Sequence, residues 1–249
     1  MRSDYPQIFQ DASAVDKYQN VVYASGSYSS DVSARQLAYM RDLVTTSFST
    51  PPVQHDFACG TGRALRMLTG QVADAHGYDV APAMLEAARG LGTRAALHVV
   101  PADGPTPQPV ASEGPTLVTV FRLLLNATPP VRRRALAFAA AALPTADSGL
   151  LVLENHGPRR SLRHLNRWRR RDNPWFAELS DAEVRTLLHE YGFELVARRG
   201  FALTGQGWYR TPVLRHVARF LDDGLADRLP SLATNVLYVA RRDRSAVGP

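Results

Sequence analysis

The sequence predicts an α/β protein built on a doubly wound parallel sheet with helices on both faces. Short apolar segments alternate with segments of helical pattern, and connections of this kind place successive strands parallel to one another. A glycine-rich turn follows the first apolar segment, and an aspartate ends the second. In open parallel sheets such features meet at the carboxyl ends of the strands, where ligands bind. The expected strands span residues 52–57, 75–80, 95–101, 115–121, 149–154, 193–202 and 233–240.

The helices between these strands are expected from their terminal signals and composition. Pro82 stands at an early helical position, where its missing N–H costs nothing. Gly70 is expected to end a helix, and Ser180 with Glu183 matches the capping-box pattern. An alanine-rich run supplies the long helix after the fourth strand. The expected helices span residues 33–46, 62–70, 82–89, 131–143 and 180–191.

Length and composition are those of one globular α/β domain with added peripheral segments. The chain has 249 residues, of which 45% are hydrophobic and 21% charged. It contains no apolar run long enough for a membrane span and no apolar core of a secretory signal at its start, so a cytoplasmic location is expected. Cys59 is the only cysteine, which excludes an intramolecular disulfide. The net charge of +6 comes almost entirely from arginine and does not by itself indicate a nucleic acid partner.

The chain divides into a main domain, a helical segment before it and a short tail after it. Residues 1–48 are expected to form a helical cap, which either packs on the surface or covers a ligand. Residues 49–242 form the main domain, and the segments 156–179 and 205–231 are insertions at the rim of its sheet, where specificity elements are usual. Residues 243–249 are expected to be disordered.

The turn after the first strand is the strongest ligand signal in the chain. It reads Asp56-Phe-Ala-Cys-Gly-Thr-Gly62, and glycines at alternate positions let the backbone pass close to a ligand. A dinucleotide fingerprint would need a small residue where Leu65 stands, and no phosphate-binding loop is present. Asp79, at the end of the second strand, is placed to accept hydrogen bonds from a ribose. Together these residues indicate a nucleoside cofactor held without a pyrophosphate cradle.

These motifs resemble the Rossmann-like methyltransferases that use S-adenosyl-L-methionine. The resemblance covers residues 50–155 well and 180–242 in pattern only, and it implies seven strands with the last one antiparallel. It implies that the glycine loop lies under the methionine part of the cofactor, that Asp79 binds the ribose hydroxyls, and that Val80 and Met84 flank the adenine. The loop positions carried over are Asp56, Ala58, Cys59, Gly60 and Gly62, where Ala58 departs from the usual glycine.

Two further loops correspond to cofactor-contacting regions of that family. Asp103, with Ala102 and Gly104, follows the third strand and is expected to receive the adenine amino group, although Asp-Gly is also a common turn pair. Phe121 and Arg122 follow the fourth strand and are expected to lie between cofactor and acceptor.

Candidate acceptor-side residues follow the fifth strand and lie in the peripheral segments. His156 is the candidate general base, because imidazole titrates near neutrality, and the alternative is a histidine that satisfies a loop carbonyl. Glu154 is expected to orient His156 or to bind substrate. Tyr23 and Tyr209 are candidate pocket residues, with core packing as the alternative for Tyr209. Arginines crowd residues 158–171, either as a solvated helix face or as a site for an anionic substrate.

The expected activity is methyl transfer to a small molecule, with a hydroxyl of a specialised metabolite or sugar as the preferred acceptor. Transfer to an amine is the close alternative, and RNA or protein methylation and a non-catalytic cofactor-binding role are more distant ones. No metal is expected to take part, since the sulfonium donor is already activated. Nucleic acid and membrane partners are not expected, and a homodimer is compatible with the sequence.

Overall fold

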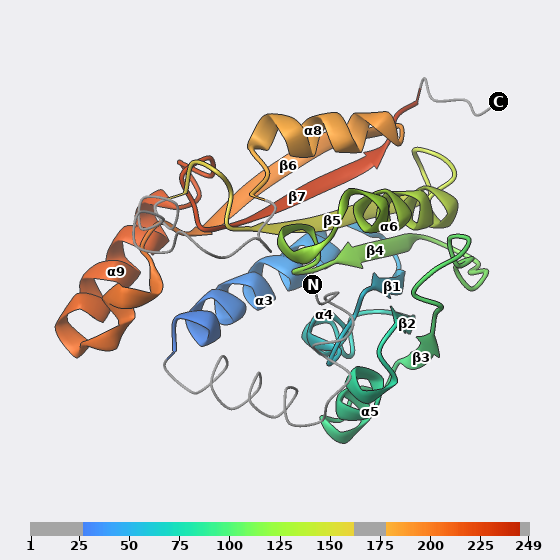
Figure 1. The fold of residues 1–249 in the computed structure, drawn as a ribbon, viewed down its shortest axis with the longest axis horizontal. Coiled ribbons are helices and arrows are strands. Elements are labelled where there is room, and N and C mark those ends of the chain that lie inside the picture. Colours follow the sequence, from blue (N-terminus) through green and yellow to red (C-terminus); the bar gives the residue numbers. More distant parts are fainter. Residues whose placement is uncertain (1–26, 162–177, 245–249) are drawn as a thin grey trace, which may run out of the picture.

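One mixed sheet of seven strands forms the centre of the molecule in the computed structural model, which describes residues 27–161 and 178–244. The strand order is β3-β2-β1-β4-β5-β7-β6, and β7 runs antiparallel to both of its neighbours. The predicted doubly wound sheet with an antiparallel last strand is therefore confirmed (Figure 1). The strands are β1 Val53–Phe57, β2 Asp74–Asp79, β3 Ala96–Val99, β4 Thr116–Val120, β5 Gly149–His156, β6 Phe193–Ala202 and β7 Asn235–Arg242.

Helices cover both faces of this sheet, and each face has its own apolar core. On one face α6 packs over β1 and β4 and α8 over the edge strand β6, and α3 and α4 lie on the other face (Figure 1). The alternation of strand side chains divides the cores: Val118 of β4 joins the first and Leu117 the second. The helices are α3 Tyr28–Ser47, α4 Arg63–Met67, α5 Pro82–Gly90, α6 Pro129–Ala142, α8 Asp181–Glu190 and α9 Pro212–Leu225, with short 3-10 turns η2 Leu124–Asn126 and η4 Gln206–Arg210.

Two helix boundaries differ from those expected, and one expected helix start is confirmed. The first described helix begins at Tyr28 and not at residue 33, because the Ser27 hydroxyl caps it by accepting from the Ser30 amide. The helix after the glycine loop spans only Arg63–Met67, short of the expected end at Gly70. The expected capping box of α8 is present, with Ser180 and Glu183 bonded reciprocally.

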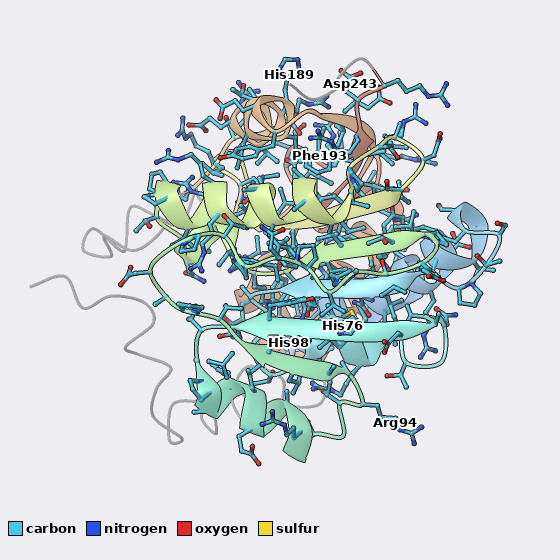
Figure 2. The ribbon with its side chains drawn as sticks, turned by 90° about the vertical axis from the view of Figure 1, so that its right-hand side faces the viewer. His76, Arg94, His98, His189, Phe193 and Asp243 are labelled. Carbon is cyan, nitrogen blue, oxygen red and sulfur yellow. The ribbon has the colours of Figure 1, made fainter. Side chains whose placement is uncertain are left out.

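A stack of imidazole and phenol rings crosses the strands on the α6 face. His55 of β1 is buried, and the centre of its ring lies 5.2 Å from that of His76. Nδ1 of His76 lies 3.3 Å from Nε2 of His98. Figure 2 shows His76 and His98 on adjacent strands. Burial and the neighbouring histidines lower the pKa of His55 to about 4, so this residue is neutral in the folded protein at neutral pH.

The insertion between β6 and β7 is described throughout its backbone and contains η4 and α9. A buried carboxylate joins it to the body: Asp222 of α9 accepts hydrogen bonds from the amides of Leu203 and Thr204 and from the hydroxyl of Tyr209. Arg35 of α3 lies 3.5 Å from the same carboxylate. Residues 162–177 of the other expected insertion and residues 245–249 of the expected tail lie outside the described residues.

In the part of the chain that the structure describes, no helix combines the length and the apolar character that crossing a membrane requires.

Candidate cofactor and acceptor site

The glycine loop between β1 and α4 is held in a left-handed backbone conformation at three positions. Ala58, Gly60 and Gly62 have φ angles of 58°, 54° and 73°. Glycine adopts this region at no steric cost, whereas Ala58 pays for its Cβ, which explains why the resemblance favours glycine there. No atom lies within 4 Å of a Cβ built on Gly60, so the loop presents open space at that position.

Asp79 is joined directly to this loop. Its Oδ2 accepts the amide hydrogen of Gly60 at 2.8 Å, and its Oδ1 accepts that of Ala81 at 2.9 Å. Burial raises the pKa of Asp79, while these amide donors act in the opposite direction. The two strongest sequence signals, 19 residues apart, thus form one structural unit at the carboxyl ends of β1 and β2.

Three other predicted cofactor residues, Val80, Met84 and Cys59, lie close to this unit along the chain. Val80 and Met84 follow Asp79, and Met84 is buried against Ala81 at the start of α5. Cys59 is buried against Leu65 and Leu85, and burial raises the pKa of its thiol.

The carboxyl group of Asp56 lies below the loop, inside the sheet. It is 1% exposed and accepts a hydrogen bond from the Thr119 hydroxyl at 2.7 Å. Burial raises its pKa to about 7, and the Thr119 hydrogen bond opposes this rise. The position suits support of the loop from beneath, and a direct cofactor contact by Asp56 stays a prediction.

The predicted adenine loop after β3 is exposed and held from behind. Ala102, Asp103 and Gly104 form a bend, and all three residues are exposed. Arg134 of α6 donates to the carbonyls of Ala102 at 2.9 Å and Pro105 at 3.0 Å. One arginine therefore ties the backbone of this loop to the α6 face of the sheet.

A buried polar cluster connects the glycine loop to β5. Glu154 is fully buried, and its carboxylate accepts from Gln36 at 2.8 Å, from Arg63 at 2.9 Å and from the backbone amide of Arg122 at 3.1 Å. The Arg63 guanidinium also donates to the Gln36 amide oxygen at 2.7 Å and lies 5.2 Å from the centre of the Phe121 ring. Burial alone would raise the pKa of Glu154, but the charges of Arg63 and Arg122 hold it below its usual value.

This cluster refines the expectations for Glu154, Phe121 and Arg122. The structure brings all three together near the carboxyl ends of β4 and β5, and the Glu154 carboxylate is occupied by protein donors. Arg63 and Gln36 are the residues that sequence reasoning missed. Arg63 directly follows the glycine loop, and Gln36 interrupts the buried stripe of α3, so both carried a local signal.

His156 is the last residue of β5, whereas the sequence predicted that this strand ends at Glu154. It pairs with Asn235 of β7, whose side-chain amide donates to the Tyr28 hydroxyl at 2.9 Å. Because side chains alternate along a strand, His156 shares a face with Glu154, on the α3 side of the sheet. The candidate base therefore lies at the carboxyl edge, on the face that also holds the Arg63 cluster.

Of the two predicted pocket residues, Tyr23 and Tyr209, the structure describes only Tyr209. Tyr23 lies outside the described residues. Tyr209 is 4% exposed, donates to Asp222 at 2.6 Å and stands 5.3 Å from the Tyr28 ring, so it supports α9. Its expected contact with an acceptor stays a prediction.

Two hollows open away from this edge. One of about 360 Å³ lies near the amino ends of β4 and β5, and one of about 310 Å³ lies between α3, β6 and α9. We place the site by the loop and Asp79 because these carry the ligand-binding chemistry. Within residues 27–161 and 178–244, no three or more His, Cys, Asp or Glu residues are grouped to hold a metal ion.

The fold, the glycine loop and its bond to Asp79 define a Rossmann-like methyltransferase. A family model described as a methyltransferase domain matches residues 34–198, and the chain belongs to this family. It is accordingly an S-adenosyl-L-methionine-dependent methyltransferase, and that compound is its cofactor. No curated protein matches the sequence.

Solved structures share the fold at low sequence identity. A putative methyltransferase in complex with the Trm112 activator from Haloferax volcanii is 15% identical, with a TM-score of 0.60 and coverage of 98% of this chain and 100% of that one. A methyltransferase from Archaeoglobus fulgidus is 14% identical, with a TM-score of 0.58 and coverage of 92% and 99%. Magnesium protoporphyrin IX methyltransferase of Synechocystis, with bound S-adenosylhomocysteine, is 14% identical, with a TM-score of 0.55 and coverage of 94% and 100%.

Proposed function

We propose that the protein methylates a hydroxyl group of a small molecule, such as a specialised metabolite or a sugar, in the cytoplasm. The observation that carries the proposal is the position of His156 at the carboxyl end of β5, on the same face as the anionic Glu154. A hydroxyl acceptor needs a base beside the methyl donor, and an imidazole at this edge is placed to serve as one.

The residues of the loop fit the cofactor. The open space at Gly60 admits a ligand against the backbone, and the Asp79 carboxylate stands beside it. In this proposal Asp79 accepts from the two ribose hydroxyls, Val80 and Met84 flank the adenine, and residues 102–104 meet its amino group. Phe121 and Arg122 separate this half from the acceptor. When bound, the cofactor supplies an activated methyl group.

The chain's own residues then perform two tasks. The scaffold holds the acceptor oxygen in line with the reacting carbon, and such alignment can lower a barrier by about 7–11 kcal/mol. His156 takes the hydroxyl proton, and the buried Glu154 charge stabilises the imidazolium that forms. Arg63 and Gln36 keep Glu154 in place and ionised.

The cofactor assignment is tested by calorimetry with Asp79→Ala. Loss of hydrogen bonds to a charged group costs about 1.5–3 kcal/mol, so the dissociation constant should rise about ten- to a hundred-fold. Asp74→Ala, at the opposite end of the same strand, is the matched control and should bind normally. Equal affinity of wild type and Asp79→Ala would remove the ribose assignment.

The acceptor assignment is tested with His156→Gln on a panel of hydroxyl and amine compounds. Loss of a general base should lower turnover of a hydroxyl acceptor about 10²- to 10⁴-fold, while the affinity for S-adenosylmethionine stays unchanged. His189→Gln, on α8, is the control. A variant that keeps full activity on hydroxyl acceptors at every pH would exclude His156 as the base.

Transfer to an amine is the second candidate. An amine with a free lone pair needs orientation and no strong base, so an amine acceptor would be methylated by His156→Gln at near the wild-type rate. This outcome separates the two acceptor classes within the same panel.

A further inference from the structure

The α9 helix turns its apolar side chains away from the body of the protein. Val213 is 75% exposed, Val217 44% and Phe220 79%, and the spacing of four and three residues places them on one face. We call these three residues, with the flanking Leu214 at 43%, the outer face of α9. The side that faces the body carries Ala218 and the carboxylate of Asp222, both buried.

This orientation opposes the usual preference of an amphipathic helix. Full burial of a valine or phenylalanine side chain gains about 1.5–3 kcal/mol, so an amphipathic helix normally buries its apolar stripe. Here α9 cannot roll inward, because the buried bonds of Asp222 to Leu203, Thr204 and Tyr209 fix its rotation. The outer face therefore remains available to a partner surface.

The chain enters the described structure beside this helix. Residues 1–26 precede Ser27, and the next residue, Tyr28, lies edge-on to Tyr209 in the turn before α9. In the first turn of α3, Asp31 accepts two hydrogen bonds from Arg219 of α9, at 2.8 and 2.9 Å. The N-terminal segment is thereby tethered to the helix whose outer face is uncovered.

The N-terminal segment also has a matching apolar pattern. Ile8, Phe9, Ala12 and Val15 recur at spacings of one, three and three residues, which would align them on one side of a helix. Of the positions between them, Gln10, Asp11 and Ser13 are polar. Eleven residues separate Val15 from Ser27 and can span about 36 Å when extended. The 14 residues of α9 extend about 21 Å, so the whole outer face is within reach.

We propose that residues 1–26 dock on the outer face of α9 and bury Ile8, Phe9, Ala12 and Val15 against Val213, Val217 and Phe220. The docked segment runs into Tyr28, which bonds Asn235, the β7 partner of His156. The proposal concerns packing and holds whichever acceptor the enzyme uses.

Cysteine alkylation in the full chain tests the docking. The native Cys59 is buried and its thiol pKa is raised, so its background reaction is slow. Val217→Cys places a reporter in the outer face, and Val196→Cys, 52% exposed on β6, is the reference. If the segment docks, the rate of alkylation at position 217 should be lower than that at position 196 by a factor of about ten or more.

Two double variants in the N-terminal segment identify what covers the reporter. Ile8→Asp with Phe9→Asp should bring alkylation at position 217 up to the reference rate, whereas Gln10→Asp with Ser13→Asp adds the same charge at polar positions and should leave it slow. Rapid alkylation at position 217 in the otherwise native segment would overturn the proposal. So would protection that ignores Ile8 and Phe9 but grows with protein concentration, which would assign the face to a second copy.

Discussion

Two buried carboxylates, one in each half of the sheet, have opposite electrostatic surroundings. We name the halves for their proposed roles. Asp56 lies in the cofactor half, formed by β3, β2, β1 and β4, and Glu154 lies in the acceptor half, formed by β5, β7 and β6. Both are at most 1% exposed. Burial raises the pKa of Asp56 to about 7 against the opposing effect of the Thr119 hydrogen bond, whereas the arginines around Glu154 hold its pKa below the usual value.

The difference shows how the two halves are built. In the cofactor half, neighbours in one strand pair supply the contacts, as when Thr119 of β4 bonds Asp56 of β1. In the acceptor half, α3, α4 and the turn after β4 each send one donor to Glu154. The acceptor half therefore depends on the relative placement of elements far apart in sequence, and breaking a single contact there has a larger effect.

Arg63→Met should give the largest loss of stability. Removing one partner of a buried ion pair leaves an uncompensated charge and costs about 3–5 kcal/mol, so the free energy of unfolding in urea at pH 7.5 should fall by that amount. The loss should shrink at low pH, because protonation of Glu154 removes the unpaired charge.

The matched control for this prediction is Arg66→Met, one turn further along α4. Its guanidinium bonds the Thr61 carbonyl and the Thr93 hydroxyl, so this change removes a charge of the same sign without breaking the Glu154 pair. If both variants lose the same small amount of stability, the Arg63–Glu154 ion pair does not stabilise the contact between the two halves.

Asp56→Asn should stabilise the protein, with an effect that depends on pH. Between pH 3.8 and about 7 the folded protein keeps a proton that the unfolded chain has lost, so wild-type stability falls as the pH rises through this window. Asparagine stays neutral and its amide oxygen can still accept from Thr119. The free energy of unfolding of the variant should therefore exceed that of wild type by up to about 4 kcal/mol at pH 8, and by almost nothing near pH 4.

Urea denaturation at several pH values measures this difference, and the exposed Asp74→Asn is the control. A gain that is constant from pH 4 to pH 8 would mean that Asp56 is ionised throughout, and the contrast with Glu154 would disappear.

Ala58→Gly should have the smallest effect. Its φ of 58° costs an L-residue about 1–2 kcal/mol, and glycine gives back about 0.5–1 kcal/mol as lost chain entropy. A net gain of about 0.5–1 kcal/mol in thermal or urea unfolding is expected. Ala81→Gly, at a φ of −104°, should instead lose stability. A loss at position 58 would show that the loop relaxes from the left-handed conformation.

The sequence alone determined the sheet, the glycine loop and Asp79, because these depend on local patterns. Alternating apolar and helical segments define the strands. The positive φ angles of the loop favour glycine, and the helix after the loop returns the chain to a parallel strand whose carboxyl end, with Asp79, lies at the same edge of the sheet. The loop and Asp79 therefore lie together as their order predicts, joined by the 2.8 Å bond from Gly60.

Only the tertiary structure decided which partners the acceptor-side residues have. Glu154 was expected to orient His156 or to bind substrate, and Tyr209 to line a pocket or to pack in the core. Packing gives Glu154 the donors Arg63 and Gln36, and it gives Tyr209 the acceptor Asp222. The same holds for α9, which lies in a segment that the sequence marked only as an insertion, and whose apolar face is turned outward by the bonds of Asp222. The physical reason is that a buried charge must be paired wherever the chain brings a donor, and the position of that donor is a property of the fold and not of the local sequence.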